Sequence, residues 1–148
     1  MTDLKKSNTQ RRIMETFFLG YQAFTAKPDA ILARRGLSRV HHRILFFIGS
    51  YPGLSVKELL GYLGVSKQAL NTPLRQLVEM HLVESLTAVD DKRKRMLRFT
   101  DEGAKLEQQL RREQVRLLEK VFGEIGAEAV ENWLQVNHAL AARAHKTH

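Results

Sequence analysis

The sequence has no cysteine, only 3 prolines among its 148 residues, and no long run of apolar residues. Without cysteine the chain forms no disulfide, no thiolate metal site and no thiol nucleophile. A membrane-spanning helix needs about 18 or more consecutive apolar residues, and no segment approaches that length. The first ten residues also lack the apolar core of a secretory signal. We therefore expect a cytoplasmic protein that has no membrane partner.

Motifs of catalysis and metal binding are scarce as well. The chain has no glycine-rich phosphate loop, no serine on a nucleophile elbow and no pair of carboxylates suited to a cleft. His41 and His42 form the only adjacent histidine pair, and segment 101–122 contains no histidine that could complete a metal site. We predict no enzyme activity, no metal and no cofactor, and we expect the histidine pair to lie partly exposed on a helix.

Basic residues are in excess, and they are unevenly placed. The formal charge is +8, from 24 Lys and Arg against 16 Asp and Glu. Residues 1–100 hold 17 basic and 8 acidic side chains, whereas residues 101–148 hold 7 and 8. This pattern favours a polyanionic partner for the first two thirds of the chain, either nucleic acid or an acidic membrane surface. Basic residues that merely keep the protein soluble are the plain alternative.

Apolar spacing and capping residues predict six helices and one hairpin. The first helix covers 9–27 and ends at Pro28, because the residue before a proline is pushed out of the α region; a further helical turn follows over 29–35. Ser55 and Glu58 form a capping box that starts a short helix. The remaining elements are a helix from Ser38 to Gly49, a helix over 66–80, strands over 82–89 and 95–100, and helices over 101–122 and 127–144, separated by Gly123 and Gly126.

Two short helices joined by a turn at Gly64 and followed by a hairpin are typical of a winged helix-turn-helix. The predicted fold class is therefore mainly α with a small β-hairpin, an α+β architecture. Such a fold suits duplex DNA. The second helix of the motif fits the major groove and reads base edges, and the hairpin lies along the backbone and reaches the minor groove.

The predicted reading helix over 66–80 has an apolar face and a polar face. Its apolar face consists of Leu70, Leu74, Leu77 and Val78. The polar face carries residue types that pair with bases and phosphates, although an ordinary solvated face is the alternative. Pro73 is expected to kink or shorten this helix, since proline lacks the amide donor. The predicted DNA contacts of the helix are Ser66, Lys67, Gln68, Asn71, Thr72 and Arg75.

The tip of the predicted hairpin carries a run of four basic residues. These are Lys92, Arg93, Lys94 and Arg95, and we predict that they contact DNA. Asp91 lies two residues before Arg93, a spacing that allows a bidentate pair to aim the guanidinium into the minor groove. A charge run that is only a solvated loop is the alternative.

Several of these features together resemble the multiple-antibiotic-resistance-regulator (MarR) family of bacterial winged-helix transcription regulators. The resemblance covers residues 37–103. His81 departs from it, because the family usually has glycine after the reading helix, where φ is often positive. The Thr72-Pro73 pair looks like a variant found in some members. The segments that carry the resemblance are Gly36-Leu37-Ser38, Val56–Leu63, Ser66–Glu79, Leu82-Val83-Glu84, Asp91-Lys92-Arg93 and Leu97-Arg98-Phe99-Thr100 with Gly103.

The resemblance implies a homodimer and a pseudo-palindromic operator. Residues 1–148 would form one MarR-like domain, with the winged helix-turn-helix over 37–103 and dimerisation helices over 9–35 and 101–145. The resemblance also implies a repressor that releases DNA when a small aromatic or phenolic effector binds. A winged-helix module that contacts protein or RNA without operator specificity is the alternative function, because fold does not fix function.

An aromatic stripe on the first helix has two interpretations. Phe17, Tyr21 and Phe24 recur at helical spacing and are predicted to form core or dimer interface. Alternatively, they line an apolar effector pocket between the first, second and fifth helices, with Arg39, His41 and His42 as its polar groups.

Overall fold

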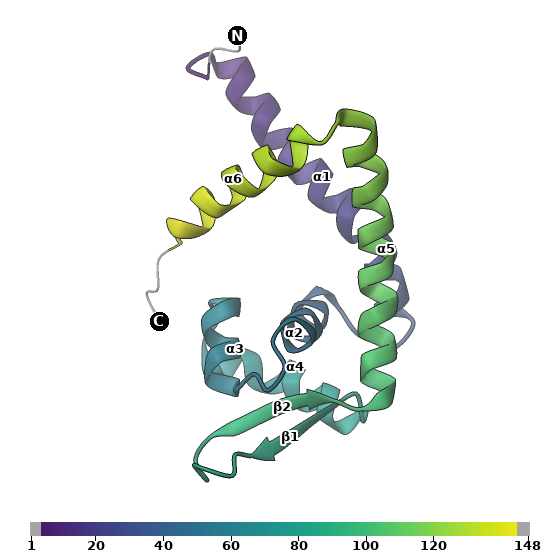
Figure 1. Ribbon diagram of the computed structural model, residues 1–148, viewed down its shortest axis with the longest axis vertical. Helices are drawn as coiled ribbons and strands as arrows, with labels where there is room; N and C mark the ends of the chain where they lie inside the picture. The colour runs from purple at the N-terminus through teal and green to yellow at the C-terminus, as the bar shows by residue number, and fades with distance from the viewer. Residues whose placement is uncertain (1–3, 145–148) are drawn as a thin grey trace.

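The computed structural model describes residues 4–144 and has six helices and one two-stranded antiparallel sheet in that range. In Figure 1, α2, α3, α4 and the hairpin form a lower body, α5 rises along its side, and α6 turns back from the upper end of α5. This arrangement confirms the mainly α fold with a small hairpin. The elements are α1 (Ser7–Ala33), α2 (Arg39–Ser50), α3 (Val56–Leu63), α4 (Lys67–Glu79), β1 (Val83–Thr87), β2 (Arg95–Phe99), α5 (Asp101–Ile125) and α6 (Glu128–Ala142).

The hydrophobic core lies in the lower body and along the first half of α5. Every buried apolar side chain comes from the segment between the end of α1 and Leu110, and no residue of α6 is buried within the described chain. Fully burying one such leucine contributes about 1.5–3 kcal/mol. The core consists of Leu32, Leu37, Ile44, Leu45, Ile48, Leu54, Leu59, Leu70, Leu77, Leu82, Val83, Leu97, Leu106 and Leu110.

Local capping fixes the helix-turn-helix. The Ser55 hydroxyl accepts the Glu58 amide hydrogen at 3.1 Å, and the Glu58 carboxylate accepts the Ser55 amide hydrogen at 3.0 Å. These hydrogen bonds from Ser55 lower the pKa of Glu58. Gly64 ends α3 with φ of 64°, a conformation that glycine adopts without strain. Ser66 then caps α4 by accepting the Ala69 amide hydrogen at 3.1 Å. The predicted motif is present.

The predicted helix ends at Pro28 and before Gly123 were wrong, and Pro73 does not shorten its helix. Helix α1 continues through Pro28, α4 continues through Pro73, and α5 continues through Gly123 to Ile125. Pro28 cannot donate to the Phe24 carbonyl, but the Gln114 side chain of α5 donates to that oxygen at 3.2 Å. Both proline rings are buried, so packing offsets the lost amide donors.

The hairpin is joined closely to the start of α5. His81 has φ of 59°, as expected at a position where the family usually has glycine. The Thr100 hydroxyl donates to the His81 carbonyl at 2.6 Å and accepts the Gly103 amide hydrogen at 3.0 Å. A Cβ at Gly103 would lie only 1.8 Å from the Leu82 carbonyl oxygen. Only glycine therefore allows this approach of α5 to the wing.

Candidate nucleic-acid interface

Helix α4 presents the polar face that its sequence predicts. Leu70, Pro73 and Leu77 are buried, while Leu74 and Val78 are half-buried against the core. All six predicted contacts on the helix are exposed to solvent, namely Ser66, Lys67, Gln68, Asn71, Thr72 and Arg75. This places amide, hydroxyl and guanidinium groups on one accessible helix face.

Arg75 pairs with Glu79, one helical turn further along the same face. Its Nε lies 3.7 Å from Glu79 Oε1, and both side chains are largely exposed. An exposed pair of this kind contributes about 0–1 kcal/mol, so Arg75 leaves it at little cost. The guanidinium is therefore available for bidentate pairing with a guanine edge.

The wing tip is organised by Asp91, although not as predicted. The Arg93 amide and the Arg93 Nε both donate to the same carboxylate oxygen, at 2.9 Å and 3.4 Å. The predicted ion pair between Asp91 and Arg93 is thus present, but the guanidinium joins it through Nε alone and not as a bidentate pair, and the Arg93 side chain is 93% exposed. The Lys94 amide also donates to the Asp91 carbonyl at 3.0 Å. Asp91 therefore holds the Arg93 backbone firmly and holds the guanidinium only through the longer contact to Nε.

A basic hollow of about 880 Å³ joins the wing to the starts of α3 and α4. Its lining includes Lys57, which the sequence analysis did not select, and Lys67 at the first position of α4. Asp91, Arg93, Lys94 and Arg95 approach it from the wing. Two helix N-termini with basic side chains nearby suit a phosphate backbone. Lys57 could have been found in the sequence, because it directly follows the first residue of the capped helix.

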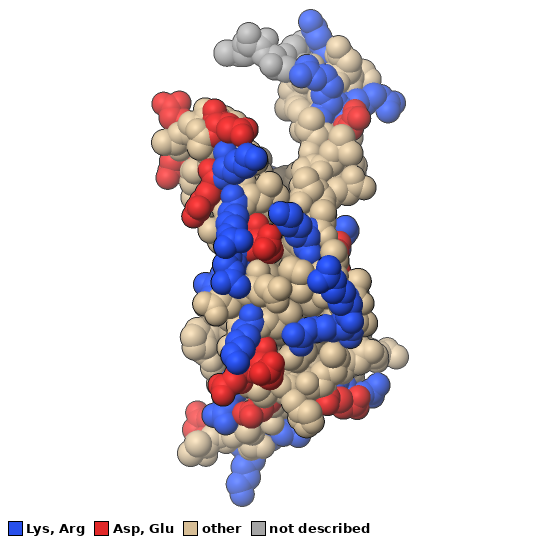
Figure 2. Space-filling model, turned by 90° about the vertical axis from the view of Figure 1, so that its right-hand side faces the viewer, with Lys and Arg blue, Asp and Glu red and all other residues tan. Residues whose placement is uncertain are grey.

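Basic side chains also occur away from this hollow. Figure 2 shows the α5 side of the molecule, where Lys and Arg side chains gather across the middle of the face. Arg111, Arg112 and Arg116 are exposed on α5. Net positive charge alone therefore does not single out a candidate interface, whereas the polar face of α4 and the basic hollow occur together at one place.

The aromatic stripe on α1 is not part of the core of this chain. Phe17 is 58% exposed, Tyr21 is exposed and Phe24 is half-buried. The Arg39 guanidinium lies 5.3 Å from the centre of the Tyr21 ring, and Arg39 Nε pairs with Asp29 Oδ2 at 2.8 Å. Core packing within the chain is therefore the wrong interpretation for Phe17 and Tyr21, whereas an interface with a second chain stays a prediction.

Both histidines of the predicted pair are buried, which corrects the expectation of partial exposure. His41 is 6% exposed and His42 is 8% exposed. Burial lowers the pKa of His42, and Asp29 partly opposes this effect. The Ser38 amide donates to His41 Nδ1 at 3.0 Å, so Nε2 carries the hydrogen and donates to Gln76 Oε1 at 2.7 Å. His41 thus ties the start of α2 to the reading helix and has no ring nitrogen left for a ligand.

A broad apolar surface runs over α1, the end of α5 and α6. We call it the apolar helical surface. Its side chains are exposed in the described chain, and large exposed apolar patches typically mark interaction sites. It comprises Ile13, Met14, Phe17, Phe18, Leu19, Val121, Ile125, Val130, Trp133, Leu134, Val136 and Leu140.

Residues 4–144 contain neither a metal-binding cluster nor a membrane-spanning helix. In that range no group of three or more His, Asp or Glu residues is placed to hold a metal ion. No helix there is both long and apolar enough to cross a membrane.

Comparison with known proteins identifies relatives over nearly the whole chain. A sequence profile of the MarR family matches residues 35–94. The HTH-type transcriptional regulator PetP of Rhodobacter capsulatus is 41% identical over 138 residues, which are 93% of this chain and 83% of PetP. The fold resembles NadR in complex with 4-hydroxyphenylacetate (TM-score 0.76, 20% identity, 97% and 99% of the two chains covered). It also resembles Staphylococcus aureus MarR in complex with salicylate and kanamycin (TM-score 0.73, 18% identity, 95% and 98% covered).

Proposed function

The chain belongs to the MarR family of transcription regulators, and on this premise we propose that it acts as a homodimeric repressor on a pseudo-palindromic operator. The observation that carries the proposal is the exposed polar face of α4 beside the basic hollow. In this proposal α4 enters the major groove, and the wing follows the phosphate backbone towards the minor groove. Selection of bound duplexes from a random library tests it, because a palindromic consensus is expected.

Base reading and backbone contact are assigned to different residues. We expect Arg75→Ala to lose preference for the selected operator, since one base contact supplies about 1–3 kcal/mol of discrimination. Lys94→Ala should instead weaken all duplexes alike and reduce the salt slope by about 0.9. Titrations of both variants against operator and random duplex at several salt concentrations measure this. Equal losses on both duplexes for Arg75→Ala would contradict its role in base reading.

Dimerisation is supported by the apolar helical surface. Helix α6 has no buried residue in the single chain, and Trp133 contacts only the Phe122 ring edge-on among the aromatic side chains of residues 4–144. Two chains that pair through α1, α5 and α6 would bury these side chains and place two reading helices about 34–36 Å apart. Sedimentation at micromolar concentration should give a dimer, and a monomer would refute the proposal. Trp133→Lys should shift the protein to monomer, whereas the exposed-surface control Lys105→Glu should not.

Release by a small phenolic effector is the second part of the proposal. It is supported by the ligands named for NadR and S. aureus MarR and by polar groups where α1 meets α2: Arg39 lies over the Tyr21 ring and pairs with Asp29, which also interacts with His42. We expect 4-hydroxyphenylacetate or salicylate to reduce operator binding, and Tyr21→Ala to abolish that response while leaving DNA affinity intact. Unchanged binding with both compounds would refute a phenolic effector of this kind.

Duplex DNA is favoured over RNA or a protein partner. The exposed face of α4 has no aromatic side chain on which unpaired bases could stack, and its charged and amide groups do not form an apolar docking patch. Affinity for duplex, single-stranded DNA and RNA at matched salt separates these classes. Tighter binding to RNA or single strands than to the selected duplex would favour the alternative module.

A further inference from the structure

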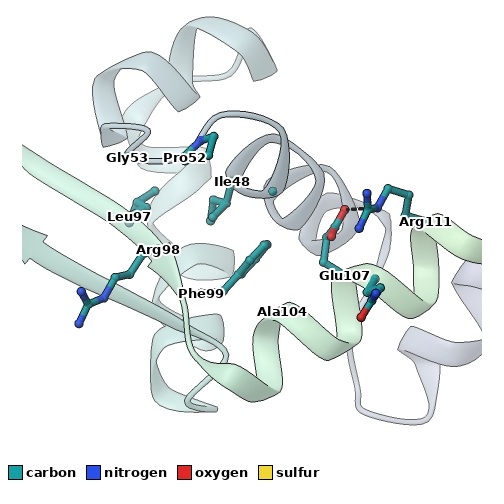
Figure 3. Close-up of a pocket in the computed structure, with 11 residues that line it drawn as sticks. Ile48, Pro52, Gly53, Leu97, Arg98, Phe99, Ala104, Glu107 and Arg111 are labelled. Atoms are coloured by element: carbon teal, nitrogen blue, oxygen red, sulfur yellow. Dashed lines mark ion pairs between the residues drawn. The ribbon is translucent and has the colours of Figure 1, made fainter.

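A second hollow, of about 360 Å³, lies between the end of α2, the turn after it, β2 and the first half of α5 (Figure 3). One side is apolar and includes Ile48, Leu97 and Phe99. The other side carries the polar side chains of Glu107 and Arg111, which lie next to each other on α5. None of the residues proposed above for the phenolic effector or for base reading lines this pocket.

Glu107 is an unusual residue for this position. It is only 8% exposed, and a Cβ placed on Gly49 would come within 2.9 Å of its carboxyl carbon. The carboxylate therefore lies against the last turn of α2, where the helix dipole is negative. Burial raises the pKa of Glu107, and Arg111 only partly opposes this. Both the location and the desolvation disfavour a negative charge here.

Within residues 4–144 Glu107 forms one ion pair, which offsets only a small part of the cost of burying its charge. Arg111 Nε lies 3.4 Å from Glu107 Oε1, and the Arg111 side chain is mostly exposed. Arg98 also borders the pocket, but it pairs with Glu84 on β1 at 2.7 Å. A buried carboxylate normally needs close pairing and further donors. The pocket thus holds an acid that a ligand cation would stabilise and an arginine that still has free donors.

The charges and the apolar wall together define a ligand class. An ammonium group on the ligand would pair with Glu107, and a carboxylate beside it would pair with Arg111. The apolar body would then pack on Ile48, Leu97 and Phe99. A simple amine would compete with Arg111 for Glu107, and a simple acid would face the buried carboxylate. We propose that this pocket binds a small zwitterionic amino acid with an apolar side chain.

Three matched probes test the proposal on the full chain by calorimetry. L-Phenylalanine carries both charges, 2-phenylethylamine lacks the carboxylate, and 3-phenylpropanoate lacks the ammonium. We expect L-phenylalanine to bind with a Kd of about 1 mM, in keeping with a ligand of this size, and each other probe to bind at least about tenfold more weakly. Equal affinity for all three probes, or no binding of L-phenylalanine, would overturn the proposal.

Variants distinguish a role of Glu107 in ligand binding from a purely structural role in its ion pair with Arg111. Glu107→Gln should lose at least about tenfold in affinity for L-phenylalanine, while its Tm should equal or exceed that of the wild type, because a neutral amide is easier to bury. Ala104→Leu should block the pocket with both charges intact. Glu102→Gln, on the same helix but outside the pocket, should bind normally. Undiminished binding by Glu107→Gln or Ala104→Leu, or a large drop in Tm for Glu107→Gln, would contradict the assigned role. Because no DNA is used, failure here is independent of the proposed repressor function.

Discussion

The hydrogen bond between His41 and Gln76 provides a sharp test of how the reading helix is held in place. His41 lies in the first turn of α2, and Gln76 follows Arg75 on α4. The 2.7 Å contact between His41 Nε2 and Gln76 Oε1 links the two helices directly. His41→Asn keeps an acceptor for the Ser38 amide but is too short to reach Gln76, so it removes the link and leaves the helix start intact.

The expected magnitudes follow from burial. His41→Asn should lower the free energy of unfolding by about 1–2 kcal/mol, the sum of one net hydrogen bond and a small loss of packing. Gln76→Ala should cost about 0.5–1.5 kcal/mol, the net value of one hydrogen bond, because Gln76 is exposed and water can replace its side chain as acceptor. If the two side chains act as a unit, the double variant should cost about 0.5–1.5 kcal/mol less than the two single changes added together.

Two measurements complete this test. Urea denaturation of the wild type, both single variants and the double variant gives the coupling energy, with Gln109→Ala on the exposed side of α5 as the matched control. Titration against operator and random duplex then shows whether loosening α4 reduces the operator preference several-fold while random-duplex affinity stays nearly constant. Strictly additive unfolding energies would refute the link, and a uniform loss on both duplexes would refute its role in positioning Arg75.

Three further outcomes are expected. Gly103→Ala should cost at least about 3 kcal/mol in urea denaturation, because its Cβ would meet the Leu82 carbonyl; a change below 1 kcal/mol would contradict the close approach. Asp91→Ala should weaken duplex binding several-fold, and the double variant with Arg93→Ala should bind no worse than Arg93→Ala alone; tighter binding by Asp91→Ala would show that the turn does not matter. Burial lowers the pKa of His42 below 6.5 in the folded protein. The preference of the fold for the neutral imidazole therefore contributes stability above pH 6.5, and this contribution is lost as the pH falls through the lowered pKa. His42→Gln should lose less stability than the wild type between pH 7 and pH 5.

The sequence was sufficient where local interactions decide the structure. The capping box at Ser55, the glycine turn at Gly64 and the cap at Ser66 act over three or four residues, so each is visible in the sequence and present in the fold. The polar face of α4 was predictable for the same reason, since it opposes a leucine stripe with helical spacing. These local features were enough to predict the winged helix-turn-helix.

The errors came from contacts between distant segments. Pro28 does not end α1, because a glutamine 90 positions after Phe24 supplies a donor for the free carbonyl. His41 is buried rather than partly exposed, and its partner Gln76 lies 35 positions away on α4. Helical spacing and capping rules consider only neighbouring residues, so they identify neither of these two glutamines as a partner. Lys57 was also missed; its place at the start of a capped helix is visible in the sequence, but the hollow that it shares with the wing forms only in the fold.

The aromatic stripe on α1 shows a different limit, because helical spacing identifies an apolar face but not what covers it. Within residues 4–144 of one chain, the core ends at Leu110, and the apolar side chains beyond it on α5 and α6 are half-buried or exposed. A 15-residue helix such as α6 is marginal in water without tertiary packing. The proposed second chain would supply that packing and would bury Phe17 and Trp133 at the same time. In the proposed dimer the same residues would serve both the stability of α6 and the spacing of the two reading helices, so dimerisation and operator recognition would depend on one surface.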